Sequence, residues 1–447
     1  MKAINYIFLG LFSILACNQV AAQTDRDIFW IHGLGSNSIH WSNYERLFQN
    51  ERRVVRSNTA QSYTTTQGVS TMANDVRNRT FRTGQNIAIA HSMGGVAARD
   101  IDSRVAPGHF GGIITVGSPL SGARIINAYK SGEVQSATSQ GVRQLTKGPI
   151  RTLGGLFNNQ PIFVKLGINY YATTLTDRLF TEALLKMVPV NVINSQSGTD
   201  LAERSPYINS VLNSSTPTPK VSIYGSEDYP VHFRVASSAI TNGVSDIELA
   251  PIVNDFASAY YGLAIYYYTV GAIEFINGIY SWNFYQIGNG LRLIYTGYGW
   301  YEGYVYIVQD SHKDWINLIG AKRTESTTEC YTGYVCGINP VCQGIRRIVE
   351  DVVYYEQTGE CNTCWAQQIC RQVSRTIIEP SDGLVHASSA QGLAPLGSTS
   401  GWNAVSIKAE SVNHAEMGTR TERYLRDIFD ASNSAVGVNR YFRTLRR

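Results

Sequence analysis

Largely apolar runs alternate with helical patterns through the first part of the chain. Three of these runs are long enough for buried strands: 27–31, 86–90 and 112–116. Residues 65–79 place apolar side chains on one face of a helix, and 94–104 also predicts a helix. Strands that are apolar on both faces and separated by helices are typical of a parallel sheet covered on both sides. The pattern therefore predicts an α/β fold with a mostly parallel sheet and helices on both faces.

Two segments interrupt this pattern. Residues 123–198 contain helical stretches such as Thr174–Met187 and predict a lid or cap over the sheet. Residues 229–379 are rich in Tyr and Gly, include a hairpin-like run at Leu291–Tyr295, and hold a Cys-rich part. We therefore expect a signal peptide at 1–22, a first part of the core that carries the lid at 23–228, an insertion at 229–379 and a second part of the core at 380–447.

The N-terminal residues have the pattern of an export signal. Lys2 supplies a positive charge, residues 6–16 form a short apolar run, and Val20-Ala21-Ala22 places small residues before Gln23. This order predicts cleavage after Ala22 and a secreted, periplasmic or cell-surface protein. Residues 14–17 also loosely match a bacterial lipobox, so a lipoprotein anchored at Cys17 is the alternative, and a buried N-terminal helix is a third interpretation.

The cysteines agree with export. Apart from Cys17, all of them lie in one stretch: Cys330, Cys336, Cys342, Cys361, Cys364 and Cys370. An even, clustered set in an exported chain predicts three disulfides, whose connectivity stays open. A zinc site or a redox pair at Cys361 and Cys364 is the alternative, but the cluster contains no His. The net charge of +4 over 447 residues gives no reason to expect nucleic acid as a partner.

The second apolar run leads directly into a candidate nucleophile. The strand at 86–90 is followed by His91-Ser92-Met93-Gly94-Gly95 and then by a helix. A serine on a sharp strand-to-helix turn has an exposed side chain, and its neighbours must be small because strand and helix approach closely. Ala90 and Gly94 meet this need. The chance occurrence of such a short string is the competing explanation, and the flanking strand and helix favour Ser92 as a nucleophile.

A serine nucleophile needs a base and an acid, which follow it in chain order in this type of fold. His414 lies beyond the last predicted strand, 404–407, and before the closing helix, so we expect it to be the base. The remaining histidines precede Ser92, follow it too closely, or are structural or solvated alternatives: His32, His40, His91, His109, His232, His312 and His386. Asp382 is the favoured acid, while Glu227 and Asp228 after the strand at 221–224 are its rivals.

A tetrahedral intermediate also needs backbone donors for its oxyanion. His32-Gly33-Leu34-Gly35 follows the first strand, where a loop can lie beside the nucleophile turn. Its glycines allow close approach of the backbone, although a plain turn would have the same residues. We expect the N–H groups of Leu34 and Met93 to form the oxyanion hole.

At these residues the chain resembles the bacterial lipase and esterase branch of the α/β hydrolases. Residues 90–95 are similar to the nucleophile elbow of small bacillar lipases, and 32–35 resemble the oxyanion loop of the family. Val116-Gly117-Ser118-Pro119 resembles a Gly-Thr-Pro segment of the family, with Ser118 in place of Thr. Residues 200–213 are similar to a segment of inositol-deacylase-like lipases. The resemblance covers 27–122, 199–228 and 381–429, and does not reach the insertion.

The resemblance implies hydrolysis of carboxylic esters, with lipid or acyl esters as substrates, through Ser92, His414 and Asp382. It implies no metal or organic cofactor. Some related lipases hold structural calcium, but this sequence shows no recognisable set of calcium ligands. A catalytically inactive surface-binding module and an amidase or peptidase on the same fold are the alternatives.

The insertion contains an uncharged stretch at Ala257–Ile273, followed by Glu274. The stretch is too short and too polar at its end to predict a secure membrane span. One interpretation is a helix buried in the core of the insertion. The other is an apolar surface near the active-site mouth that contacts a membrane or lipid interface, because tyrosine suits such an interface.

Overall fold

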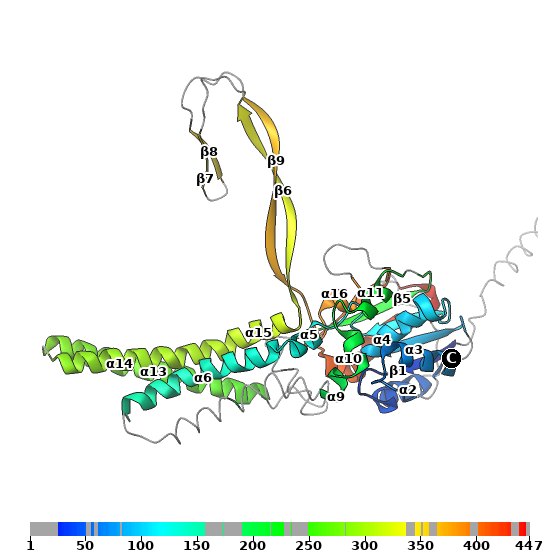
Figure 1. Cartoon of the computed structure of the whole chain (residues 1–447), viewed down its shortest axis with the longest axis horizontal. Coiled ribbons are helices and arrows are strands. Elements are labelled where there is room, and N and C mark those ends of the chain that lie inside the picture. The colour runs from blue at the N-terminus through cyan, green and yellow to red at the C-terminus, as the bar shows by residue number, and fades with distance from the viewer. Residues whose placement is uncertain are drawn as a thin grey trace, which may run out of the picture. The chain divides into compact units, whose positions relative to one another are not determined.

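The computed structural model describes most of the chain (Figure 1). The described residues are 26–50, 55–57, 61–80, 83–156, 173, 190–214, 216–227, 234, 249–281, 283–336, 345–349, 352–356, 364–393, 401–430 and 438–443. The predicted signal peptide with Cys17, the predicted helix at Thr174–Met187, and Asp228 lie outside them. The chain divides into two compact units, of which the second is Lys322–Ile378.

A six-stranded sheet forms the centre of the first unit. Its order is β10-β5-β4-β3-β1-β2, and every neighbouring pair is parallel. The strands are β1 (Arg26–Ile31), β2 (Val55–Ser57), β3 (Asn86–His91), β4 (Gly112–Val116), β5 (Lys220–Ser226) and β10 (Val405–Glu410). β3 and β4 are buried along their whole length, as the uninterrupted apolar runs require. The predicted α/β fold with a parallel sheet is therefore confirmed.

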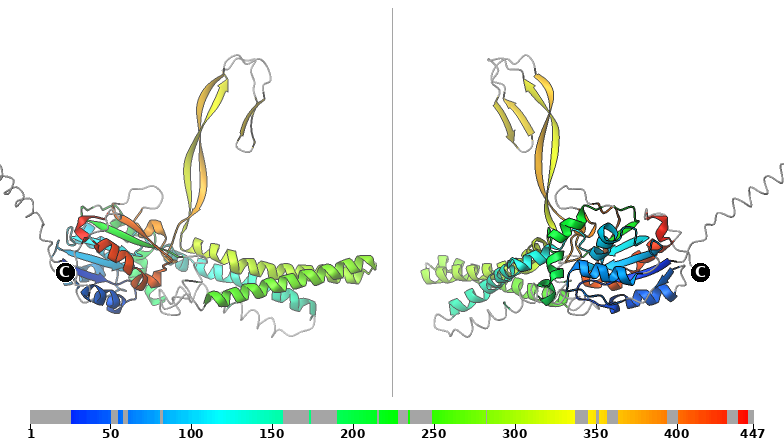
Figure 2. Two further views of the ribbon diagram at one scale, coloured as in Figure 1. Left: turned by 180° about the vertical axis from the view of Figure 1, so that it is seen from behind. Right: turned by 45° about the vertical axis from the view of Figure 1, so that its right-hand side comes forward.

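Helices cover both faces of this sheet (Figure 2). One apolar core includes side chains of α3 (Val69–Arg79), α4 (Met93–Asp100) and α5 (Arg124–Lys130). The other includes side chains of α2 (Ser42–Asn50) and α18 (Glu422–Phe429). Alternate side chains of β3 enter opposite cores, with Ala88 in the first and Ile89 in the second.

Shorter helices connect these elements. They are η1 (Ser38–Trp41), η2 (Ile101–Val105), α9 (Val190–Ile193), α10 (Gln196–Leu201), α11 (Pro206–Leu212), α16 (Ala387–Ala390), η6 (His414–Glu416), α17 (Met417–Arg420) and η7 (Arg440–Phe442). The segment predicted as a lid contains α5 and a long helix, α6 (Glu133–Leu156). Its role as a lid stays a prediction.

Two long helices occupy the first part of the insertion. α13 (Leu249–Tyr280) and α14 (Phe284–Val305) pack against each other as a helical hairpin, and α14 also packs against α6. The chain continues through a π-helical turn, η4 (Tyr306–Asp310), into α15 (Ser311–Leu318). No helix in the described part of the chain is long and apolar enough to cross a membrane.

The hairpin-like strand predicted at Leu291–Tyr295 is wrong, because these residues lie inside α14. Their alternation of apolar and polar side chains suggested a strand, but Gly290 and Gly297 on either side face α13 and fit a closely packed helix. The stretch Ala257–Ile273 is helical. Its side chains are not buried on all sides: Ala257, Tyr260 and Ala264 are buried, whereas Tyr261 and Tyr266 are exposed.

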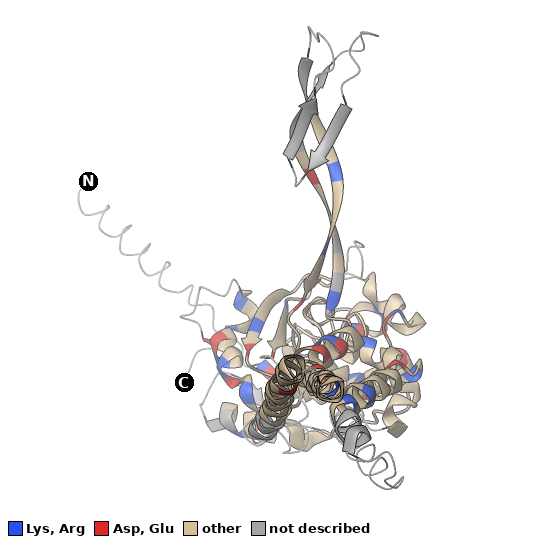
Figure 3. Cartoon of the chain, turned by 90° about the vertical axis from the view of Figure 1, so that its left-hand side faces the viewer, with Lys and Arg blue, Asp and Glu red and all other residues tan. Residues whose placement is uncertain are grey.

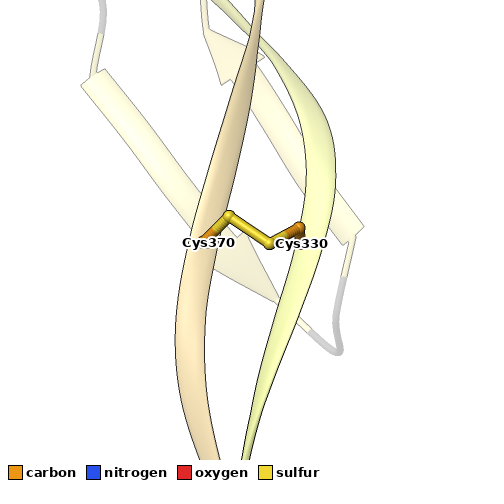
Figure 4. The surroundings of a disulfide bond; sticks show 2 residues. All are labelled: Cys330 and Cys370. Carbon is orange, nitrogen blue, oxygen red and sulfur yellow. A yellow bond between two sulfur atoms is a disulfide. The ribbon is translucent and has the colours of Figure 1, made fainter.

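The second unit consists of two β-ribbons. β6 (Lys322–Cys336) pairs antiparallel with β9 (Cys364–Ile378), and β7 (Ile345–Val349) pairs antiparallel with β8 (Val352–Glu356). A disulfide joins Cys330 of β6 to Cys370 of β9 (Figure 4). This is one of the three predicted disulfides. Cys342 and Cys361 lie outside the described residues, so the other two stay predictions.

Candidate active site

Ser92 lies at the sharp turn between β3 and α4. Its backbone has φ 51° and ψ −126°, a conformation that costs a non-glycine residue energy and persists only where the surroundings hold it. The Ser92 N–H donates to the carbonyl of Val116 at 3.1 Å, which fixes the turn to the neighbouring strand β4. A Cβ atom at Gly94 would lie 2.7 Å from the His32 carbonyl oxygen. The start of α4 therefore approaches the end of β1 so closely that only a glycine fits after Met93.

The structure brings together the three residues predicted as a triad. Ser92 Oγ lies 3.1 Å from His414 Nε2, and His414 Nδ1 lies 2.8 Å from Asp382 Oδ2. Because a carboxylate only accepts hydrogen bonds, Nδ1 carries the proton toward Asp382. Nε2 is then the free acceptor that faces the Ser92 hydroxyl. These two contacts join residues 322 and 32 positions apart in the chain.

Backbone groups hold the Asp382 carboxylate in place. Its Oδ1 accepts from the N–H groups of Leu384 (3.0 Å) and Val385 (2.7 Å), which leaves Oδ2 for the histidine. The His414 N–H in turn donates to the Asp382 carbonyl at 2.8 Å. Asp382 is fully buried, so its orientation depends on these bonds rather than on water. Trp315 of α15 adds a bond from its indole N–H to the Gly383 carbonyl at 2.9 Å.

Of the two rivals of Asp382, Glu227 is engaged elsewhere. Its carboxylate accepts from Arg234 Nε at 2.5 Å and from Asn413 Nδ2 at 2.8 Å. Asn413 is the neighbour of His414, so Glu227 acts on the loop rather than on the imidazole. Asn413 also caps the short helix η6 that carries His414.

Two glycines at the ends of neighbouring strands make room for the acid and the base. Gly117 follows β4 with φ +54°, and a Cβ atom there would lie 3.0 Å from Asp382 Oδ2 and 3.5 Å from His414 Nδ1. At Gly225 in β5, a Cβ atom would lie 2.6 Å from Asp382 Cβ. The sequence pattern predicted no role for these glycines in the site. The signal was present, because each glycine lies at the C-terminal end of a predicted strand, where sites of parallel sheets form.

The predicted oxyanion loop lies beside the serine. A Cβ atom at Gly33 would lie 2.7 Å from Ser92 Cβ, so the loop backbone touches the nucleophile turn. His32 fixes this loop, because its Nε2 accepts from the Tyr63 N–H at 2.9 Å. Among the described residues, the N–H groups of Leu34 and Met93 donate to no hydrogen bond. Both are available to a ligand next to Ser92, and Met93 is the first residue of α4, where such groups are normally free.

A stack of neutral imidazoles lies behind the base. The ring centroids of His91 and His414 are 4.8 Å apart, and those of His40 and His91 are 4.4 Å apart. Burial lowers the pKa of His40 to about 4 and, together with the neighbouring imidazoles, holds the pKa of His91 well below its usual value. Both rings are therefore neutral at pH 7. A charged ring here would oppose protonation of His414.

No group of three or more side chains suited to a metal ion occurs in the part of the chain that the structure describes. No family model matches the chain, and no curated protein matches its sequence.

Proposed function

We propose that the chain is a serine hydrolase of the α/β-hydrolase class that cleaves carboxylic esters. The observation that carries this proposal is the continuous chain of contacts from Ser92 Oγ through His414 to Asp382. A serine is a weak nucleophile at neutral pH unless a base accepts its proton, and His414 Nε2 is placed to do so. The strained turn at Ser92, whose side chain is partly accessible, supports the same role.

The proposed reaction has two halves. In the first, Ser92 Oγ attacks the ester carbonyl carbon while its proton passes to His414 Nε2. The tetrahedral intermediate collapses as His414 returns that proton to the leaving alcohol, so an acyl-serine and a free alcohol form. In the second, water attacks the acyl-serine with His414 as the base, and the carboxylic acid leaves with the Ser92 hydroxyl restored.

The surrounding groups stabilise charge in both halves. The N–H groups of Leu34 and Met93 are the proposed donors to the oxyanion, and removal of one such donor costs about 100- to 1000-fold in turnover in related chemistry. Asp382 holds His414 in the tautomer that presents Nε2 to the serine. It also stabilises the imidazolium that forms when His414 takes the proton.

We further propose lipid or acyl esters as substrates and an exported location. The substrate class rests on the resemblance of residues 90–95 and 32–35 to lipases. Export rests on the N-terminal pattern and is supported by the Cys330–Cys370 disulfide, since such bonds persist in oxidising compartments.

Hydrolysis of p-nitrophenyl esters from short to long acyl chains tests the proposal. We expect turnover on at least part of the series, and Ser92→Ala to lower it by about a million-fold while the protein stays folded. Full activity of Ser92→Ala would contradict the proposal. Cleavage of the matching p-nitroanilides, with none of the esters, would assign the same residues to an amidase.

A further inference from the structure

Glycines line the contact between the two helices of the α13–α14 hairpin. A Cβ atom at Gly290 would lie 2.4 Å from the Phe275 backbone nitrogen, and one at Gly271 would lie 2.7 Å from the Ile294 nitrogen. At Gly297 it would lie 3.0 Å from the Ala264 carbonyl oxygen. The two backbones therefore touch, and large side chains are excluded from the contact. Small residues between helices are typical of packing in a lipid environment.

Many large apolar side chains of the hairpin face outward instead. In α14, all of whose residues the structure describes, the buried residues are Gly290, Thr296, Gly297, Gly299 and Gly303. The exposed residues on the two helices include many large apolar ones: Tyr261, Leu263, Ile265, Tyr266, Ile273, Ile276, Ile279, Tyr280, Phe284, Tyr285, Leu291, Tyr295, Tyr298 and Tyr301. A helix in water buries its apolar stripe and exposes polar residues. This hairpin has the reverse arrangement, and an exposed apolar surface of this extent indicates a partner.

The end of the hairpin is aromatic and uncharged. We define the tip as residues 275–281 and 283–291; between Glu274 and Arg292 the sequence has no charged residue. Tyr280, Phe284 and Tyr285 are 84%, 78% and 85% exposed. Figure 3, which views the chain from the side where the hairpin ends in Figure 1, shows little charge on these helices.

Several backbone groups at the tip are paired within the hairpin itself. The Asn283 side chain accepts from the N–H groups of Tyr285 and Gln286 at the start of α14. The Ser281 N–H donates to the Asn277 carbonyl at the end of α13. Backbone groups that are paired within the segment are a condition for entering a region poor in water.

The distribution of the exposed side chains favours a lipid surface over a protein groove. The exposed apolar side chains of the tip belong to both helices on either side of the turn: Ile276, Ile279 and Tyr280 in α13, and Phe284, Tyr285 and Leu291 in α14. A groove that binds a helix covers one stripe of it. Tyrosine and uncharged polar residues such as Asn277 and Asn289 suit the headgroup region of a bilayer.

We propose that the tip of the α13–α14 hairpin inserts into the headgroup region of a lipid bilayer and attaches the chain to its surface. The nearest charged residues are Glu274, about 9 Å along α13 from its end at Tyr280, and Arg292, about 12 Å along α14 from its start at Phe284. These lengths are comparable with the depth of interfacial helices, about 5–10 Å. The proposal concerns attachment only and does not depend on the proposed hydrolysis.

Flotation with phosphatidylcholine vesicles tests the proposal. The experiment uses the full chain with Ser92→Ala, so that the lipid stays intact. We expect binding at low salt and unchanged binding at high salt, because the tip carries no charge to be screened. The combined change Tyr280→Ser, Phe284→Ser and Tyr285→Ser should lower the partition coefficient by at least about 100-fold. These side chains are exposed, so the melting temperature should stay unchanged.

A matched variant on the same hairpin is the control. Tyr261→Ser, Tyr298→Ser and Tyr301→Ser lie on the other side of Glu274 and Arg292 from the tip and should leave binding within a few-fold of the parent. Absence of binding by the parent chain, equal loss in both triple variants, or loss of binding at high salt would each overturn the proposal. A stable dimer of the parent chain that the tip variant dissociates and the control variant does not would also overturn the proposal, because the tip would then bind a second copy of the chain. Turnover of a soluble short-chain ester by chains with Ser92 intact reports separately on the proposed function.

Discussion

At the scale of single residues, the geometry of the site depends on glycines as well as on polar side chains. Gly33, Gly94 and Gly117 each lie where a Cβ atom would meet the serine, the oxyanion loop or the acid. The polar residues Ser92, His414 and Asp382 could be predicted from the sequence, because few residue types can act as nucleophile, base and acid. Gly33 and Gly94 were also predicted, because a close approach of the backbone was expected at both positions. Gly117 was not, because a glycine after a strand equally predicts an ordinary turn.

A comparison of Gly117→Ala with Gly108→Ala separates the effect of backbone strain from an effect on the geometry of the site. Gly117 and Gly108 both have positive φ, so alanine at either costs about 1–2 kcal/mol of folding free energy. Nothing lies within 4 Å of a Cβ atom at Gly108, whereas at Gly117 the Asp382 carboxylate is 3.0 Å away. We expect similar melting temperatures for the two variants but a loss of ester turnover of at least about tenfold in Gly117→Ala alone. Equal turnover in both would show that Gly117 has no part in positioning the acid.

At the scale of elements, the strands that carry the site were predictable and the helical hairpin was only partly so. The apolar run at 86–90 has no polar interruption, and its strand leads into the turn at Ser92 as predicted. The run Leu291–Tyr295 has an ambiguous period, and its helical state depends on contact with a separate helix, α13, which the run itself does not reveal. The stack of His40, His91 and His414 escaped prediction for the same reason, since it joins three separate elements.

Trp315 connects α15 to the loop of the acid and is expected to be a positioning residue. Trp315→Phe keeps most of the buried volume but removes the hydrogen bond to the Gly383 carbonyl. We expect a loss of about 1–2 kcal/mol in stability and a several-fold lower kcat with little change in KM. Trp402→Phe is the matched control, because it loses a buried bond to Ser222 that does not touch the site. If both variants lose kcat to the same degree, the effect is one of general stability.

At the scale of the whole molecule, the chain forms two units that are stabilised in different ways. The first unit buries a large apolar core on both sides of a parallel sheet. The second consists of β-ribbons and carries a covalent bond between its long strands. A ribbon of two strands is marginal on its own in water, so a disulfide gives it stability that packing does not.

The register of the long ribbon predicts the disulfide connectivity that the sequence left open. Cys336 lies opposite Cys364, as Cys330 lies opposite Cys370, and the two cysteines on each strand are six positions apart. An even spacing places both pairs on the same face. We expect bonds Cys336–Cys364 and, by elimination, Cys342–Cys361. Peptide mapping without reduction should find these links, and free thiols or bound zinc would contradict them.

The most direct test of the central claim is the site and rate of labelling by a fluorophosphonate, which reacts with a serine whose proton has an acceptor. We expect mass spectrometry to find the adduct on Ser92. Asp382→Asn should slow labelling by up to about 10,000-fold, because His414 would present the wrong tautomer. Glu227→Gln should slow it far less, since that carboxylate binds Arg234 and Asn413 instead. Labelling at another residue, or an unchanged rate in Asp382→Asn, would contradict the account.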